Sequence, residues 1–147
     1  MFKNILVPLD VDDPANAQRA LEQAGFLANA SGGSVHLLYI RFHLPKTYAG
    51  LLPAGFDARE RDECMAKLEE WKAQLGLPDD RVTLTLRRGS VAAEVLDEAR
   101  ERNVDLIVIG SHLPSLSSRL LGSNAASIIR DATISVLVIR EGNREVA

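Results

Sequence analysis

The segment "GSHLPSLSSRLLGSNAAS" holds the residues of this sequence that are best suited to binding an anion. It begins with Gly110, directly after an apolar run, and its Gly122-Ser123-Asn124 triplet stands where a helix is expected to start. A helix N-terminus offers unpaired N–H groups and the positive end of the helix dipole, and both attract phosphate. The side chains of Ser123 and Asn124 could add hydrogen bonds, and Arg119 supplies a permanent positive charge. These residues together predict a phosphate-binding loop.

The same segment also fits an ordinary helix cap, because Gly-Ser before a helix and serine-rich loops are both common. His112 could donate to a phosphate or act as a general base, or it could be a surface histidine without a role. From the residues alone, phosphate binding and simple capping both remain open.

The elements that would position this loop follow from hydrophobic periodicity. Short runs rich in Val, Ile and Leu predict five strands, at Asn4–Asp10, Val35–Ile40, Arg81–Arg88, Asp105–Gly110 and Ser135–Arg140. Apolar residues at three- and four-residue spacing predict four helices, at Pro14–Ala30, at Phe56–Leu75, at Val91–Arg102 behind the cap Ser90, and from the cap Ser123 to about Asp131.

Strands that alternate with helices predict an α/β fold with right-handed crossovers. We predict a five-stranded parallel sheet of order 3-2-1-4-5 with helices on both faces, in a Rossmann-like arrangement. The run "DLIVIG" is continuously apolar, which indicates a central strand, whereas "VTLTL" alternates and indicates a strand near an edge.

Ligands of open α/β sheets bind beyond the carboxyl ends of the strands, where the strand order reverses. Three predicted strands end there, near Asp10, Ile40 and Gly110, so the candidate loop falls at this edge. Asp10 could contact a ligand or could cap the helix that follows it.

The composition narrows the class of protein. The 147 residues, 46% of them hydrophobic, suit one compact core, and we expect residues 1–147 to form a single domain. No apolar run approaches the roughly 20 residues that cross a bilayer, and Pro8 and Asp10 interrupt any signal-peptide layout. A net charge of −3 without a basic block argues against nucleic acid, and the single Cys64 rules out an internal disulfide. We therefore expect a cytoplasmic protein with no nucleic-acid or membrane partner.

Two other segments stand out. The Pro- and Gly-rich stretch Arg41–Gly55 is long for a connection and could form a lid or a binding rim. The charged run "DARERDE", residues 57–63, is interpreted as a solvated helix face with internal ion pairs.

The strings "NILVPLD", "HLLYI" and "DLIVIGSH…LLGSNAASIIRDATISVLVIR" resemble the universal stress protein family over almost the whole chain. Nucleotide-binding members carry the motif G-x2-G-x9-G-[ST] after the fourth strand. Here Leu113 replaces the middle glycine and the interval to Gly122 is one residue shorter. The arrangement "SHLPSLSSRLLGSNAAS" is more similar to the F/G-type members, which implies an ATP-binding loop.

The resemblance implies roles for the matching positions. Adenine and ribose would be held by residues that follow the first two strands, namely Pro8, Asp10, Val11 and Ile40. Ribose and the α-phosphate would lie beside Gly110, Ser111 and His112. The β- and γ-phosphates would be held by Gly122, Ser123 and Asn124. Arg119 joins this site on its charge and position, and a magnesium ion on the phosphates could be approached by Asp12 or Asp13.

We assign no catalytic residue and no metal ligand, because the sequence has no G-x-S-x-G, H-E-x-x-H or P-loop lysine motif. A dimeric ATP-binding stress-response regulator, with at most slow ATP hydrolysis, is the function that we expect. The alternative is a family member that binds no nucleotide and acts through an unknown protein partner. The apolar last strand would be an edge strand, and the resemblance implies a homodimer through it, with Val136 and Val138 at the interface.

Overall fold

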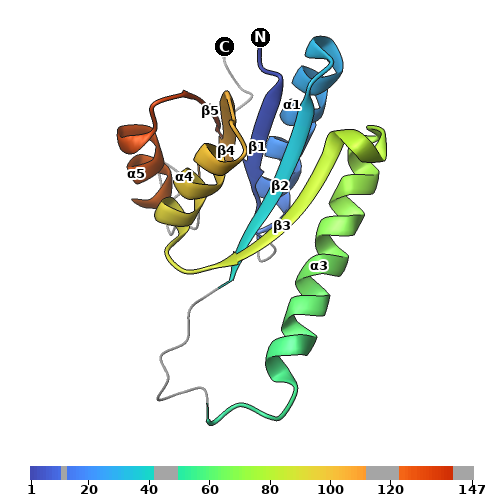
Figure 1. Cartoon of the computed structure of the whole chain (residues 1–147), viewed down its shortest axis with the longest axis vertical. Helices are drawn as coiled ribbons and strands as arrows, with labels where there is room; N and C mark the ends of the chain where they lie inside the picture. The colour runs from blue at the N-terminus through green and yellow to red at the C-terminus, as the bar shows by residue number, and fades with distance from the viewer. Residues whose placement is uncertain (11–12, 42–49, 112–122, 141–147) are drawn as a thin grey trace, which may run out of the picture.

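The computed structural model describes residues 1–10, 13–41, 50–111 and 123–140 (Figure 1). The strands are β1 Asn4–Pro8, β2 Ser34–Arg41, β3 Val82–Arg88, β4 Leu106–Gly110 and β5 Ser135–Ile139. The helices are α1 Pro14–Ser31, α3 Phe56–Leu75, α4 Val91–Glu101 and α5 Ser123–Asp131, with a short 3₁₀ turn η1 at Asp79–Arg81. The strands form one parallel sheet of order β3-β2-β1-β4-β5, which confirms the predicted fold.

The apolar pattern of each strand matches its place in the sheet. All five residues of β4 are buried, and this strand lies between β1 and β5. Most of the alternating strand β3 is only partly buried, and it forms one edge. The other edge is β5, as expected.

Helices cover both faces of the sheet, and each face has its own core. On one face, α1 and α3 pack against the strands through residues such as Leu21, Leu68 and the fully enclosed Trp71. On the other face, α4 and α5 contribute Val95 and Ile128. Figure 1 shows these two helix pairs on opposite sides of the sheet. Since every crossover helix returns the chain to the start of a parallel strand, α1, α4 and α5 all begin at the carboxyl edge.

The cap of α1 differs from the one that the sequence suggested. Asp13 occupies the N-cap, and its carboxylate accepts a hydrogen bond of 3.3 Å from the backbone N–H of Asn16. The alternative in which Asp10 caps this helix is therefore wrong. Gly32 ends α1 in the left-handed region, at φ 74°, where a residue without Cβ is favoured.

Two other predicted caps also need adjustment. Ser123 is itself helical within α5 and therefore is not its cap. Ser90 does occupy the N-cap of α4, but its side chain makes no capping hydrogen bond, and only its carbonyl accepts the Glu94 N–H, at 2.9 Å.

The charged run at the start of α3 binds the sheet instead of pairing within the helix. The guanidinium of Arg41, at the end of β2, donates to Asp57 at 2.6 Å and to Glu60 at 3.1 Å. Arg88, at the end of β3, also contacts Asp57. The expected solvated face is confirmed, since most of this run is exposed, but the expected pairing within the run is wrong for Asp57 and Glu60, whose ion-pair partners in the structure are arginines at the strand ends. The cluster fastens the first turn of α3 to the carboxyl edge of the sheet.

Candidate functional site

The site predicted from the sequence lies at the reversal of strand order between β1 and β4. The chain moves outward from β1 through β2 to β3, and then returns to place β4 on the other side of β1. Backbone pairing of β1 with β4 is limited to Ile5 with Leu106 and Leu6 with Ile107, so it stops short of Gly110. Open α/β sheets bind ligands in the crevice that such a reversal creates.

Gly110 ends β4 in direct contact with the first turn of α1. A Cβ built on Gly110 would lie 1.9 Å from Oδ1 of Asn16, far closer than two non-bonded atoms approach. The Asn16 side chain is buried, with 2% of the residue exposed. A glycine here leaves the backbone open to a ligand, and the structure gives a second reason for it, since the Asn16 amide fills the space that a side chain would need.

The backbone after Gly110 continues the sheet instead of turning away at once. The N–H of Ser111 donates to the carbonyl of Ile139 at 3.0 Å, and Ser111 is buried, with 3% exposed. Ser111 is thus fixed at the strand end, where its backbone can border a ligand that lies along the edge.

The residues expected to hold adenine and ribose lie at the ends of β1 and β2. Pro8 is buried at the end of β1, and the next N–H, that of Leu9, donates to Leu38 at 2.8 Å. Asp10 follows and is half-buried. Ile40 lies near the end of β2, partly buried against the core beneath α4 and α5. The structure therefore brings Pro8, Asp10 and Ile40 to the same edge as Gly110.

Of the residues predicted to bind the β- and γ-phosphates, the structure describes two, Ser123 and Asn124, at the start of α5. Ser123 is exposed and Asn124 is half-buried, while Ala125 and Ile128 anchor the helix in the core. The first N–H groups of any helix have no partner inside the helix, so a helix start can attract an anion. Because α5 follows β4, its first turn lies on the carboxyl side of the sheet, where the other site residues end.

Several predicted site residues lie outside the described residues, namely Val11, His112, Arg119 and Gly122. Asp12 lies outside as well, whereas Asp13 is the cap of α1. Within the ranges that the structure describes, no three His, Cys, Asp or Glu side chains gather closely enough to hold a metal ion. No helix in that part of the chain is long and apolar enough to cross a membrane.

Sequence reasoning missed Asn16, which is a polar side chain on the buried stripe of α1. The signal was available, because Asn16 precedes Ala17 and Ala20 on the face that the periodicity assigns to the core. A polar residue at such a position needs a specific neighbour.

It also missed an ionic cluster between β3 and α4. Glu98 is nearly enclosed, and it accepts hydrogen bonds from Arg87 at 2.9 Å and from Arg102 at 3.0 Å. Burial disfavours the charge of Glu98, but the hydrogen bonds from Arg87, Arg102 and Thr85, together with the charge of Arg102, outweigh burial and lower the pKa of this carboxyl. Arg87 also binds Glu94, at 3.1 Å, and Glu101. The spacing of the three glutamates along α4 was the available signal.

His36 lies beside this cluster, buried in β2. Its Nδ1 is 2.6 Å from the Thr83 hydroxyl and its Nε2 is 3.4 Å from Oδ1 of Asn4. Burial is the main cause that lowers the pKa of His36, and the charge of Arg102 acts in the same direction, against Glu98. A neutral ring that donates from Nε2 and accepts at Nδ1 satisfies both neighbours.

Comparison with known proteins places these features in context. Residues 1–140 match the universal stress protein family. Universal stress protein G of Escherichia coli O157:H7 is 36% identical over 146 residues, which cover 95% of this chain and 100% of that protein.

Among solved structures, universal stress protein UspA from Lactobacillus plantarum superposes with a TM-score of 0.76 at 25% identity, covering 95% of this chain and 98% of that one. The universal stress protein from Archaeoglobus fulgidus in complex with dAMP shares the fold, with a TM-score of 0.66 at 23% identity, over 95% of this chain and 98% of that one.

Proposed function

The chain belongs to the universal stress protein family, and from that premise we propose that it is a dimeric, ATP-binding regulator of a stress response. The nucleotide would lie across the carboxyl ends of β1, β2 and β4 and would reach the start of α5. The protein would act in the cytoplasm as a switch whose partner contacts depend on the nucleotide, with at most slow hydrolysis of ATP.

The observation that carries this proposal is the meeting of β1, β2 and β4 ends at the reversal of strand order. Pro8 and Asp10 would border the adenosine, and the backbone of Gly110 and Ser111 would pass beside the ribose. The first turn of α5 would offer backbone N–H groups to phosphate. A carboxylate and a helix N-terminus suit the hydroxyl groups and the phosphates of a nucleotide.

The fold has a precedent for such a ligand, since dAMP is bound in the Archaeoglobus fulgidus structure. A triphosphate would carry Mg²⁺ mainly on its own oxygens, so few protein ligands would be needed. Asp13 is engaged as the cap of α1. We therefore assign it no role toward the ion.

Dimerisation is supported by the position of β5 at the sheet edge. The strand carries the apolar sequence "SVLVI" with no proline and no charge, a composition that favours pairing of an edge strand with a second chain. We propose an antiparallel pair about a two-fold axis, with Val136 and Val138 at or near the interface. Light scattering at micromolar concentration is expected to give twice the chain mass, and a monomer would contradict the proposal.

The nucleotide is tested by mass spectrometry of small molecules released from the protein as purified from cells. An adenine nucleotide in near-stoichiometric amount is the expected result. A matched test compares wild type with Gly122→Val, which places a branched side chain in the loop and is expected to weaken ATP binding by about tenfold or more. Unchanged ATP affinity in Gly122→Val would show that the segment is only a helix cap, and would favour a protein that acts through protein contacts alone.

A further inference from the structure

The helix α3 is attached to the rest of the protein in two different ways along its length. Its last three turns pack through apolar side chains, since Leu68, Trp71 and Leu75 are buried and Met65 packs against the same core. Every residue from 56 to 63 is exposed or half-buried instead. The first two turns of α3, residues 56–63, therefore bring little apolar surface to the sheet.

The buried stripe of α3 continues into these first two turns with carboxylates. The buried residues of the helix recur at three- and four-residue spacing, namely Cys64, Leu68, Trp71 and Leu75. The same spacing, counted backward from Cys64, reaches Glu60 and Asp57. The face that is apolar in the last three turns is therefore acidic in the first two.

Two arginines of the sheet bind this acidic face. Arg41 donates to Oδ1 of Asp57 at 2.6 Å, to the carbonyl of Asp57 at 3.1 Å and to Oε1 of Glu60 at 3.1 Å. Arg88 contacts Asp57 as well, and it is the register partner of Arg41 on the neighbouring strand. The N-cap of α3 is Gly55, which has no side chain with which to bond the first N–H groups. The start of α3 thus depends on ionic contacts.

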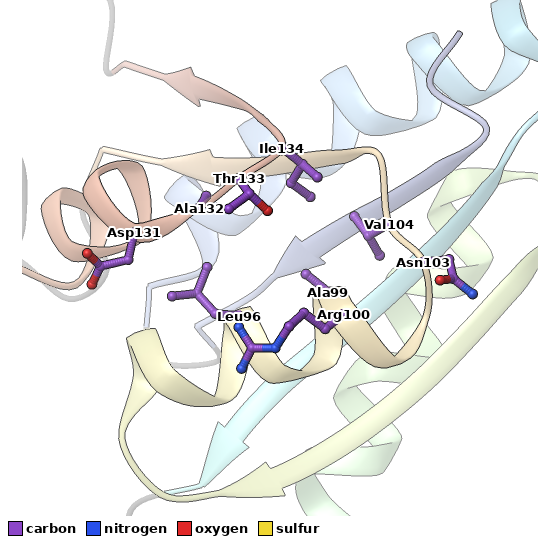
Figure 2. A pocket seen from close by; sticks show the side chains of 9 residues that line it. All are labelled: Leu96, Ala99, Arg100, Asn103, Val104, Asp131, Ala132, Thr133 and Ile134. Carbon is purple, nitrogen blue, oxygen red and sulfur yellow. The ribbon is translucent and has the colours of Figure 1, made fainter.

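The helix α4 also begins at the carboxyl edge, but it packs through apolar side chains from its first residue. Val91 and Leu96 pack against the core of that face. Figure 2 shows Leu96 and Ala99 on the side of α4 that faces Ala132 and Ile134, with which they line a cavity. Ionic attachment is therefore not a general property of the helix starts at this edge.

Ionic and apolar contacts respond differently to salt. The Arg41 side chain is 8% exposed, but the Asp57 side chain that it binds is 65% exposed. Exposed charges are screened over about 10 Å in 0.1 M salt and over about 3 Å in 1 M salt, whereas the burial of apolar surface does not depend on charge screening. Segments with few buried apolar contacts also open at a lower free energy than the core does.

We propose that residues 56–63 open from the sheet as a separate unit, held closed by an ionic latch that consists of Arg41, Arg88, Asp57 and Glu60. The last three turns of α3 stay packed during this opening. Rising ionic strength weakens the latch, so the segment uncovers the carboxyl ends of β2 and β3 in response to salt. This inference depends neither on the proposed nucleotide nor on the proposed dimer.

The test is hydrogen exchange of the full chain, followed by mass spectrometry. Wild type is compared with the double variant Asp57→Asn/Glu60→Gln, which removes both charges and keeps both shapes. The N–H groups of residues 60–63 are expected to exchange at least about fivefold faster in the double variant, while those of residues 68–75 keep their wild-type rates. Equal rates at residues 60–63 in the two proteins would overturn the latch. Faster exchange along all of α3 would overturn the separate unit.

The matched control is Glu70→Gln. Glu70 pairs with Lys67 in the same helix at 3.2 Å, and its side chain is 65% exposed, as is that of Asp57. We expect this variant to leave the exchange of residues 60–63 unchanged. The same acceleration in Glu70→Gln as in the double variant would overturn the latch, because any exposed ion pair of α3 would then have the effect.

A second measurement needs only the wild type. Raising NaCl from about 0.1 M to about 1 M is expected to speed exchange at residues 60–63 by about twofold or more, relative to residues 95–98 of α4. An unchanged ratio between these two segments at the two salt concentrations would overturn the latch.

Discussion

Asn16 lies where any side chain at position 110 would have to go. Gly110 does not adopt the left-handed backbone conformation that by itself favours glycine. The contact with Asn16, 1.9 Å from an added Cβ, is therefore what restricts this position. Asn16 and the end of β4 therefore pack as one unit.

Because Gly110 and Asn16 pack together, we expect the effects of substitutions at these two positions on the free energy of unfolding to be coupled. Gly110→Ala is expected to lower the free energy of unfolding by about 1–3 kcal/mol, because the new methyl group overpacks the site. Adding Asn16→Ala removes the obstructing amide, so the double variant should recover most of that loss relative to Asn16→Ala alone. Urea unfolding of the wild type and the three variants measures the coupling. Strict additivity of the two substitutions would show that the residues do not obstruct one another.

His36 makes stability depend on pH in a predictable direction. Its pKa is lowered in the folded chain by burial and by Arg102, so the unfolded chain takes up its proton first as the pH falls. The contribution of neutral His36 to the free energy of unfolding is fully present above the pKa of histidine in the unfolded chain, about 6.5. It is lost as the pH falls through the lower pKa of the folded chain.

The check is a comparison with His36→Gln, which cannot titrate but can still donate and accept a hydrogen bond. Between pH 7 and about 5, the free energy of unfolding should decline more steeply for wild type than for His36→Gln. Parallel curves of unfolding free energy against pH for the two proteins would mean that His36 has the same pKa in the folded and the unfolded chain.

At the scale of elements, Glu98 joins α4 to β3 and to its own last turn. Glu98→Gln keeps the shape but removes the charge that Arg87 and Arg102 bind, and we expect a loss of about 1.5–3 kcal/mol in unfolding free energy. The matched control is Glu101→Gln. Glu101 also contacts Arg87, but its side chain is 65% exposed, against 3% for Glu98. Glu101→Gln should lower the free energy of unfolding by less than about 1 kcal/mol. Equal losses in Glu98→Gln and Glu101→Gln would contradict the importance of burial.

The elements themselves were predictable, because apolar periodicity and turn residues are local signals. The bounds of α3 and the start of β1 agree with the prediction, and the burial of β4 and the edge position of β3 followed from their patterns. Contacts between elements were not predictable in the same way. The pairing of Arg41 with Asp57 depends on how α3 is seated over the sheet.

In the candidate site too, features that depend on a single segment were predictable and contacts between elements were not. The positions of Pro8, Ile40 and Gly110 followed from where their strands end, since parallel strands meet at one edge. The packing of Asn16 against Gly110 did not, because it requires the crossing of α1 over β4, which no single segment of sequence encodes.

At the scale of the whole molecule, the sheet separates two functions in space. The carboxyl edge gathers the ends of β1, β2 and β4 with the start of α5, where we propose the nucleotide. The β5 edge of the sheet is where we propose that a second chain pairs. Because α5 connects the proposed nucleotide loop to β5, it is the element through which nucleotide binding would affect the proposed dimer.

The central claim is that the start of α5 binds phosphate, and Ser123→Asp tests it most directly. A carboxylate at a helix N-terminus stabilises the helix by about 0.3–1 kcal/mol, so a loss of binding in this variant would not reflect unfolding. Ser127→Asp, one turn further along α5, places the same charge away from the free N–H groups and serves as the control.

The measurement is a calorimetric titration of ATP with Mg²⁺ into wild type, Ser123→Asp and Ser127→Asp. We predict binding to wild type, an affinity at least about tenfold weaker in Ser123→Asp, and a much smaller change in Ser127→Asp. Absence of binding to wild type, or equal affinities for wild type and Ser123→Asp, would contradict the account.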